Sequence, residues 1–595
     1  MSDPRLYRAA LVPVLLALIL LGFSLENRPR ALTTTLAPDA FAGDRAFDRA
    51  YGSGGLADRF PDRRPGSLGD ERLADLAVAQ MREAGFRVRS IVHEGDTIDG
   101  KRRLRTVIAE RTGTVDERVV VVAHRDAAGP RAEAELSATA ALLELARVFG
   151  APRQTQRTLT LVSTSGGSGG AAGAARLADE LTGPVAGVLV LGDLASRNLR
   201  VPLLSPWSNS AGGSPARLRS TLQDALRLET GGAVKAPRAL SQAARFALPG
   251  TYGEQGVLLA RGLPAITLAI GGDRGPPAGA PVSRERLTQL GRAALRTVTA
   301  LDSVPRGRPV NARASSSDLV TSRKVLPGWA VRLFVGALLL APLVVAVDAL
   351  AAVRRAREPI LVWLRWTLVS ALPPAVAAAF AIGLGAVGLI AATPGTPVAP
   401  DALPAQATAL LAVALVLVLA WVWLRPALLR VARAPSRVGE VSSPAAGVVV
   451  LLVAVLATVA VWAGNPYAAA PLAPALHLWL FALAAELELR RVVRVALVVL
   501  GLLPVAIVAT AVARALGLGG LDAAWELLLV VAGGHVSLWS VLVWSLLGGC
   551  AAAALTVAWH SRPREDAGAP PITVRGPRSY AGPGSLGGTE SALRK

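Results

Sequence analysis

The sequence predicts an α/β domain joined to an all-α, polytopic transmembrane bundle. Between residues 26 and 326, short β-branched runs alternate with segments of helical periodicity, which is typical of a mostly parallel sheet with helices on both faces. From residue 327 to 560, and once before residue 26, apolar stretches are long enough to cross, or nearly cross, a hydrocarbon core of ~30 Å. The chain has 595 residues, and 52% of them are hydrophobic, which is too apolar for an ordinary soluble protein.

Residues 1–25 are predicted to be a short cytoplasmic stub and a retained membrane anchor. Arg5 and Arg8 precede the apolar run 9–25. A signal peptide begins in the same way, but the residues after the run, 24–27, lack the small-residue pattern of a cleavage site.

Hydrophobic periodicity places the elements of the α/β domain. A helix over 70–84 is followed by strands at 86–92 and 104–109. The strand at 118–122 is a run of valines, and the next helix begins near Ser137. The remaining predicted elements are a strand at 158–162, a helix ending at 180, a strand at 188–191, a helix after 214–215, a strand at 264–269 and a helix at 284–301.

Seven further apolar spans are predicted after the α/β domain, which makes eight with the anchor. They are 329–350, 361–392, 405–424, 444–461, 467–485, 495–513 and 538–559. The segment 525–531 is interpreted as interfacial or re-entrant. The tail 561–595 is rich in Gly, Pro and Ser and is predicted to be disordered.

The arginines predict the orientation in the cell membrane. Clusters follow the first, third and fifth of these spans, namely 354–357, 425–437 and 490–494. The intervening loops, 393–406, 464–466 and 514–536, contain a single basic residue, Arg514. By the positive-inside rule, both termini are then cytoplasmic and the domain 26–326 is extracytoplasmic.

Composition excludes two classes of function. The chain has a net charge of +21, to which the arginines that flank apolar spans contribute, and no basic stripe with interleaved aromatics occurs. The expected partner is therefore the lipid bilayer and not nucleic acid. The single cysteine, Cys550, excludes disulfides within the chain and a cysteine-based zinc site.

The predicted candidate site is the end of the valine strand. Ligands of open α/β sheets bind at the carboxyl ends of strands, and His124 and Asp126 follow the strand directly. The Gly-rich segment 166–170, after the next strand, satisfies Gly-x-Ser-x-Gly around Ser168, which allows a nucleophile with Asp193 as the acid. The same segment can also be a phosphate-binding turn, or simply a loop of small residues, which we favour.

Several stretches of the domain resemble the zinc aminopeptidase family (peptidase clan MH, family twenty-eight), which includes glutaminyl cyclases and transferrin-receptor-type proteins. They are PGSLGDERLADLAVAQMREAGFRV, VVVVAHRD, SATAALLELARVF, RTLTLVSTSGGSGGAAGAARLA, VLVLGDL and GLPAITLAIGG. The resemblance runs from about Gly66 to Leu301. It implies a site with two zinc ions, a bridging carboxylate and a glutamate base.

On this resemblance, part of the site is retained. His124 matches a zinc ligand, Asp126 the carboxylate that orients it, and Asp193 a later ligand.

The other positions are degenerate. The bridging aspartate falls on Ala134, the glutamate base and its neighbouring ligand on Gly167 and Ser168, and the last histidine near Gly275. A Ser-Asp-His found in many members is here 253–255, Gly-Glu-Gln.

We therefore expect a pseudo-peptidase in which His124, Asp126 and Asp193 are vestigial and no cofactor is bound. Its role would be to bind a peptide, a lipid-linked ligand or a partner membrane subunit. The alternative is a membrane-anchored zinc aminopeptidase in which Glu133 or Glu135, both expected to point elsewhere, supplies the missing carboxylate. A further alternative is a transporter. The layout also resembles the peptidase-like subunit of the GPI transamidase, although the composition looks bacterial.

Overall fold

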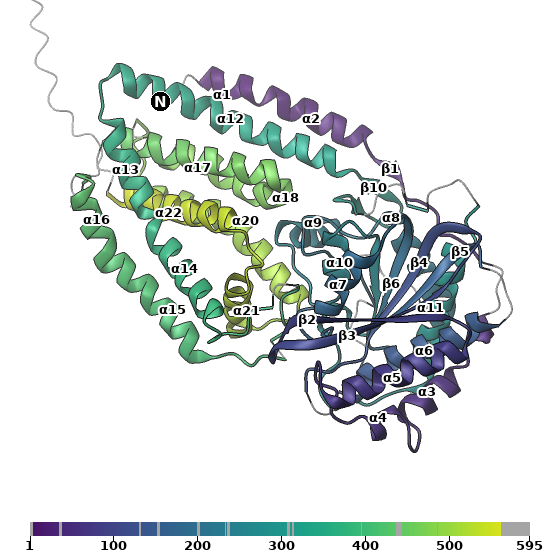
Figure 1. Ribbon diagram of the computed structural model, residues 1–595. Coiled ribbons are helices and arrows are strands. Elements are labelled where there is room, and N and C mark those ends of the chain that lie inside the picture. The colour runs from purple at the N-terminus through teal and green to yellow at the C-terminus, as the bar shows by residue number, and fades with distance from the viewer. Residues whose placement is uncertain are drawn as a thin grey trace, which may run out of the picture.

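The computed structural model describes residues 4–560, apart from short segments at 35–37, 130–131, 152–154, 199–202, 233, 235–237, 306–309, 312–314, 394, 401, 436–442 and 485. The chain forms an α/β domain and a helical half that lie against each other (Figure 1). The tail 561–595, predicted to be disordered, lies outside the described residues.

The α/β domain is built on a seven-stranded sheet in the order β2-β3-β5-β4-β6-β8-β7. Its strands are β2 Arg87–Thr97, β3 Gly100–Arg111, β4 Val115–His124, β5 Arg157–Thr164, β6 Val185–Leu191, β7 Leu204–Ser205 and β8 Ala265–Leu268. The four central strands are parallel, while β2, β3 and β7 are antiparallel at the edges. The α/β class is confirmed, and the sheet is mixed.

Helices cover both faces of this sheet because the buried valines of β4 alternate between them. Val119 and Val121 pack in the larger core, and Val120 and Val122 pack in the smaller one. On the larger side lie α3 Gly43–Tyr51, α5 Leu68–Glu83, α6 Leu136–Gly150, α8 Ala216–Thr230 and α11 Arg284–Asp302. On the other side lie α7 Ala172–Glu180 and α10 Gln255–Ala260. Periodicity did not predict α3, α10, α4 Leu56–Arg59 or α9 Ala239–Ala247.

A small second sheet contains the two segments that link the α/β domain to the apolar helices. β1 Glu26–Asn27, which follows the N-terminal helix α2 Val12–Phe23, pairs with β10 Lys324–Leu326. β10 also pairs with β9 Leu319–Val320 and leads into α12 Gly328–Arg355. The two segments that link the domain to the apolar helices are therefore hydrogen-bonded to each other.

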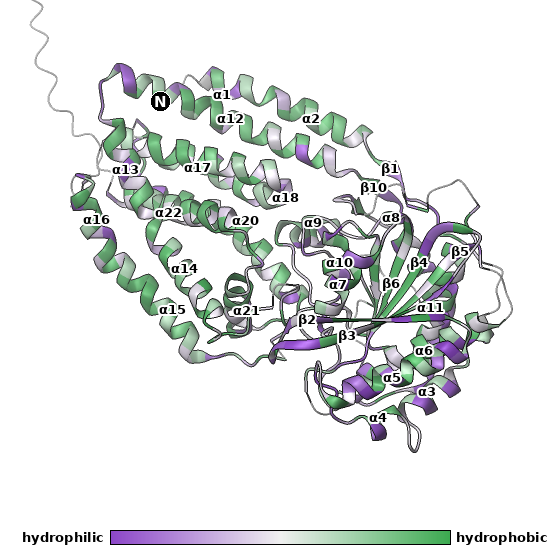
Figure 2. Cartoon of the chain, in the orientation of Figure 1, coloured by the Kyte–Doolittle hydropathy of each residue, from purple (hydrophilic) through white to green (hydrophobic). Residues whose placement is uncertain are grey.

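The helices of the other half consist mainly of hydrophobic residues (Figure 2). Its helices after α12 are α13 Ile360–Ser370, α14 Leu372–Ala386, α15 Ala407–Leu419, α16 Arg425–Val431, α17 Pro444–Gly464, α18 Pro466–Ala469, α19 Ala473–Ala482, α20 Arg491–Ala515, α21 Gly520–Ala532 and α22 Leu538–His560. Among the described residues, seven helices are long and apolar enough to cross a membrane: Arg5–Phe23, Gly328–Arg355, Ile360–Ala386, Ala407–Val431, Pro444–Gly464, Arg491–Ala515 and Leu538–His560.

The predicted span at 467–485 is not one of these seven. Its helical part, from Pro466 to Ala482, consists of α18, a 3₁₀ turn and α19. At 1.5 Å per residue it is about 25 Å long, which is short of a ~30 Å hydrocarbon core. The segment 525–531 lies within α21, a separate helix of 13 residues.

Candidate functional site

The carboxyl ends of three central strands meet at the candidate site. His124 is the last residue of β4 and pairs in register with Thr164, the last residue of β5. On the other side of β4, Ala123 pairs with Leu191, the last residue of β6, and Asp193 follows two residues later. The parallel register therefore places His124, Thr164 and Asp193 at one edge of the sheet.

His124 faces Glu254, the residue directly before α10. The His124 Nδ1 atom lies 3.9 Å from Oε2 of Glu254, and only 15% of the histidine side chain is exposed. The Thr164 hydroxyl donates a 2.6 Å hydrogen bond to the other oxygen of Glu254. Both His124 Nε2 and Glu254 Oε2 are buried without a hydrogen-bond partner.

Asp126 holds the Gly-rich turn that follows β5. Its carboxylate accepts hydrogen bonds of 3.0 Å from the backbone N–H groups of Gly167 and Ser168, and another from the Ser168 hydroxyl. Asp126 is fully buried. Its hydrogen bonds thus fix the loop, whereas the family resemblance implied that it would orient His124.

Only one of the two carboxylate oxygens of Asp193 is hydrogen-bonded. Its Oδ1 atom accepts hydrogen bonds from the backbone N–H groups of Ala195 at 2.8 Å and Ser196 at 3.0 Å. The Ser137 hydroxyl, 3.4 Å from the same oxygen, also donates to the carbonyl of Ala134 at 2.6 Å. The other oxygen, Oδ2, is buried and has no partner.

Glu135 belongs to this site, although the sequence predicted that its side chain would point elsewhere. It ends the 3₁₀ turn Glu133–Glu135, directly before α6, and its Oε2 atom is buried without a partner. Its charge interacts with those of His124, Asp126 and Asp193. The tight turn explains the error, because it rotates Glu135 inward and leaves Glu133 exposed.

Arg63 supplies a positive charge beside these acids. It is almost fully buried and donates hydrogen bonds of 2.9 Å to the carbonyls of Phe60 and Ala132. Burial lowers the pKa of Arg63, and the nearby carboxylates of Glu135 and Asp126 partly offset this. The sequence contained no signal for this residue, which lies in the irregular lead-in before α5.

The degenerate positions surround the same place. A Cβ atom at Gly167 would lie 2.3 Å from Cβ of His124 and 3.1 Å from Oε1 of Glu254, so no side chain fits there without a shift. Gly275 has a φ of 71°, and a Cβ there would lie 4.0 Å from Oε1 of Glu135. The structure thus brings the sequence-predicted positions together with Glu135 and Glu254.

Two acids of the site, Asp193 and Glu135, have pKa values raised towards neutral pH. Burial raises the pKa of Asp193 to about 6. Burial, reinforced by the charges of Asp126 and Asp193, raises the pKa of Glu135 to about 7. Burial alone would lower the pKa of His124, but the carboxylates of Asp126, Glu254 and Glu135 outweigh it and raise that pKa.

Zinc, which the family resemblance implies, does not fit the residues present. Among the residues that the structure describes, no group of three or more His, Cys, Asp or Glu side chains is arranged to hold a metal ion. Both oxygens of Asp126 are bonded to the loop at 167–168, and the Nδ1 of His124 faces Glu254. The unpaired atoms of the site are spread over four side chains, and no catalytic step through zinc follows from them.

The serine-nucleophile alternative does not agree with the geometry. The Ser168 hydroxyl donates to Asp126, and Asp193 accepts from Ser137 and from its own loop. The positive φ angles in this turn belong to Gly166, Gly170 and Ala171, and not to Ser168. A nucleophile elbow requires its strain at the serine and a histidine beside the hydroxyl.

The site lies where the α/β domain meets the helical half. The backbone N–H of Thr396, in the loop after α14, donates a 3.1 Å hydrogen bond to the carbonyl of Gly170. Gly395 is required at this contact because its Cβ would lie 1.9 Å from the same carbonyl. The pKa of Tyr252, two residues before Glu254, is raised by burial and then by the charge of Glu526 in α21. The loop at 391–400 and α21 therefore cover this edge of the domain (Figure 1).

No protein-family model and no curated protein matches this chain. Part of the chain is similar to the solved structure of Porphyromonas gingivalis glutaminyl cyclase, with a TM-score of 0.32 and 16% identity over 44% of this chain and 98% of that chain. A zinc aminopeptidase from Bacillus subtilis gives 0.35 and 11%, over 46% and 98%. A putative zinc-dependent exopeptidase from Bacteroides vulgatus gives 0.31 and 16%, over 44% and 96%. Each likeness covers less than half of this chain and identifies no activity for it.

Proposed function

We propose that this chain is a multi-pass membrane protein whose extracytoplasmic α/β domain binds, without hydrolysis, the positively charged amino end of a peptide or of a lipid-linked ligand. The observation that carries the proposal is the set of unpaired, buried carboxylate oxygens at the strand ends. These are Oε2 of Glu135, Oδ2 of Asp193 and Oε2 of Glu254.

The charge balance of the site favours a cationic ligand. Four carboxylates, those of Asp126, Glu135, Asp193 and Glu254, face one arginine and one histidine. Burying a carboxylate is costly unless a positive charge or hydrogen-bond donors compensate it. An ammonium group has three donors, and hydrogen bonds from it to these unpaired oxygens would compensate buried negative charge. The cost of burying negative charge also raises the pKa values of Glu135 and Asp193, because protonation removes that charge when no cationic ligand is bound.

Contacts between the two halves support the proposed orientation. The α/β domain contacts the helical half through the loop at 391–400, through Asn465, which donates a 2.8 Å hydrogen bond to the Phe246 carbonyl, and through Gly517, whose carbonyl accepts from Arg274. All three lie in or next to the loops that are poor in basic residues. The arginine-rich ends of α12 and α16 lie away from the domain (Figure 1). This arrangement supports an extracytoplasmic domain and cytoplasmic termini.

The same contacts support eight crossings rather than seven. Asn465 lies at the side of the α/β domain, whereas the arginines at 490–494 belong to the cytoplasmic side in this proposal. The short helical segment Pro466–Ala482 is the connection between them, and it packs against α20. We therefore propose that this segment also crosses, with local thinning of the bilayer accommodating its length.

A labelled tripeptide of alanine tests the binding function. We expect the full-length protein in detergent to bind the peptide with a free amino terminus and not its N-acetylated form. Glu135→Gln and Asp193→Asn should each weaken binding tenfold or more, or ~1.4 kcal/mol. Glu133→Gln is the matched control, because Glu133 is exposed in the same turn. Equal binding of the acetylated peptide would contradict the proposal.

The zinc-dependent aminopeptidase, whose metal the described residues of the site do not fit, is the outcome that would overturn this proposal. Zinc content and hydrolysis of a chromogenic aminoacyl substrate, measured on the same preparation, separate the two. Close to two zinc ions per chain, with hydrolysis that His124→Ala abolishes, would establish the enzyme. Peptide binding without either would establish the binding module.

A further inference from the structure

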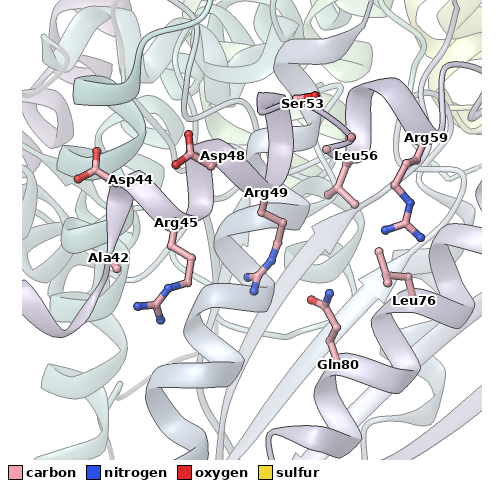
Figure 3. A pocket seen from close by; sticks show the side chains of 12 residues that line it. Ala42, Asp44, Arg45, Asp48, Arg49, Ser53, Leu56, Arg59, Leu76 and Gln80 are labelled. Carbon is pink, nitrogen blue, oxygen red and sulfur yellow. The ribbon is translucent and has the colours of Figure 1, made fainter.

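A pocket of about 600 Å³ opens between α3, α4 and α5 of the α/β domain. Its basic lining consists of Arg45, Arg49 and Arg59, and Gln80 of α5 lies opposite them. Asp44 and Asp48 also line the pocket, but in Figure 3 their carboxylates point away from the side chains of these three arginines. The pocket is separate from the strand ends and from every residue assigned to the site above.

The helical spacing of α3 sorts its charges onto two faces. Arg45 and Arg49 are one turn apart, as are Asp44 and Asp48. The two aspartates bind Arg284 of α11, with N–O distances of 3.3 Å and 2.6 Å. Arg284 therefore offsets one of these two negative charges, and both carboxylates point away from the arginines of the pocket.

The arginines of the pocket have one buried acid to share. Glu144 pairs with Arg147 at 2.8 Å, whereas the Nη1 atoms of Arg45 and Arg49 lie 3.7 Å and 3.8 Å from its oxygens. The Nη1 atom of Arg49 is buried without a hydrogen-bond partner, and so is Oε1 of Gln80. Burial lowers the pKa of Arg49; the charge of Glu144 partly offsets this, and the charges of Arg45 and Arg147 lower the pKa further. Positive charge is thus in excess at the pocket.

We propose that this pocket binds a small soluble solute that carries a phosphate group, through Arg45, Arg49 and Arg59. Guanidinium groups bind phosphate through paired N–H donors, and three of them around one space fit a multiply charged anion better than a single carboxylate. The pocket lies on the side of the domain remote from the helical half (Figure 1). A headgroup of the surrounding bilayer does not reach it, so the ligand comes from solution.

Equilibrium dialysis of the full-length protein in detergent against pyrophosphate, at 50 mM NaCl, tests the proposal. We expect saturable binding of one pyrophosphate per chain. Arg45→Gln with Arg59→Gln should weaken it at least tenfold. The matched control is Arg87→Gln with Arg89→Gln, which removes the same charge from exposed positions on β2 and should change the affinity less than twofold.

Two further measurements separate a loss of pocket binding from effects at the strand ends and from unfolding. Asp193→Asn should leave pyrophosphate binding unchanged, because it alters only the strand-end site. The thermal midpoint of the Arg45/Arg59 double variant should match that of the parent, since both side chains are exposed at the surface. The proposal is overturned if the parent protein shows no saturable binding, or if the control pair or Asp193→Asn weakens binding as strongly as the pocket pair.

Discussion

Replacing Arg125 by methionine should strongly destabilise the α/β domain. Arg125 lies between His124 and Asp126 at the end of β4, and its side chain is fully buried. Its Nε atom is 2.8 Å from Oδ1 of Asp70, which is also fully buried at the start of α5. The pair therefore joins the edge of the sheet that carries the candidate site to the helix that covers it.

The expected loss follows from what Arg125→Met leaves behind. The guanidinium donates hydrogen bonds to three backbone carbonyls, those of Asp70 at 3.1 Å, Ser163 at 3.1 Å and Arg105 at 2.7 Å. The variant loses these bonds and leaves the Asp70 carboxylate buried without its countercharge. Removing one partner of a buried ion pair costs about 3–5 kcal/mol. For a domain of about 300 residues, with an unfolding entropy of about 2.1 cal/mol/K per residue, that corresponds to a fall in thermal midpoint of about 5–8 °C.

Brief trypsin digestion after heating, applied to the full-length protein in detergent, measures this midpoint as the fraction of intact α/β domain. Adding Asp70→Asn to Arg125→Met removes the orphaned charge, so the double variant should recover part of the loss. Arg64→Met is the matched control, since Arg64 forms an exposed ion pair with Asp62 and should leave the midpoint unchanged. A fall below about 2 °C for Arg125→Met, or a double variant less stable than the single one, would refute the reasoning.

Two other predictions concern pH and orientation. In the folded chain the pKa values of Asp193 and Glu135 are raised from 3.8 to about 6 and from 4.5 to about 7, so the folded state holds more protons than the unfolded state and stability is lost as pH rises through these values. The raised pKa of His124 acts in the same direction. The thermal midpoint of the parent protein should therefore fall between pH 5 and pH 7.5. If the midpoint of the double variant Asp193→Asn with Glu135→Gln falls as steeply with pH as that of the parent, the prediction is contradicted. A cysteine introduced at the exposed Glu83 should react with a membrane-impermeant maleimide on intact cells, whereas one at the exposed Arg433 should react only after permeabilisation, with buried Cys550 as a low background. The reverse pattern would invert the proposed topology.

The sequence by itself determined the class of the fold because its signals are local. The valine run at 119–122, the helical periods around it and the long apolar spans each depend on neighbouring residues, and the structure contains elements at these positions. The placement of His124 and Asp193 at one edge of the sheet also followed from local signals, because parallel strands end at one edge of a sheet.

Tertiary structure alone decided which other side chains complete the site. Glu254 reaches His124 because the segment between β7 and β8 folds back over the sheet, and Glu135 turns inward because a 3₁₀ turn precedes α6. The pairing of the edge strands and the cover that the loop at 391–400 forms over the Gly-rich turn are likewise long-range. Such contacts depend on the packing of segments far apart in the chain, for which the spacing of residues along the sequence carries no signal.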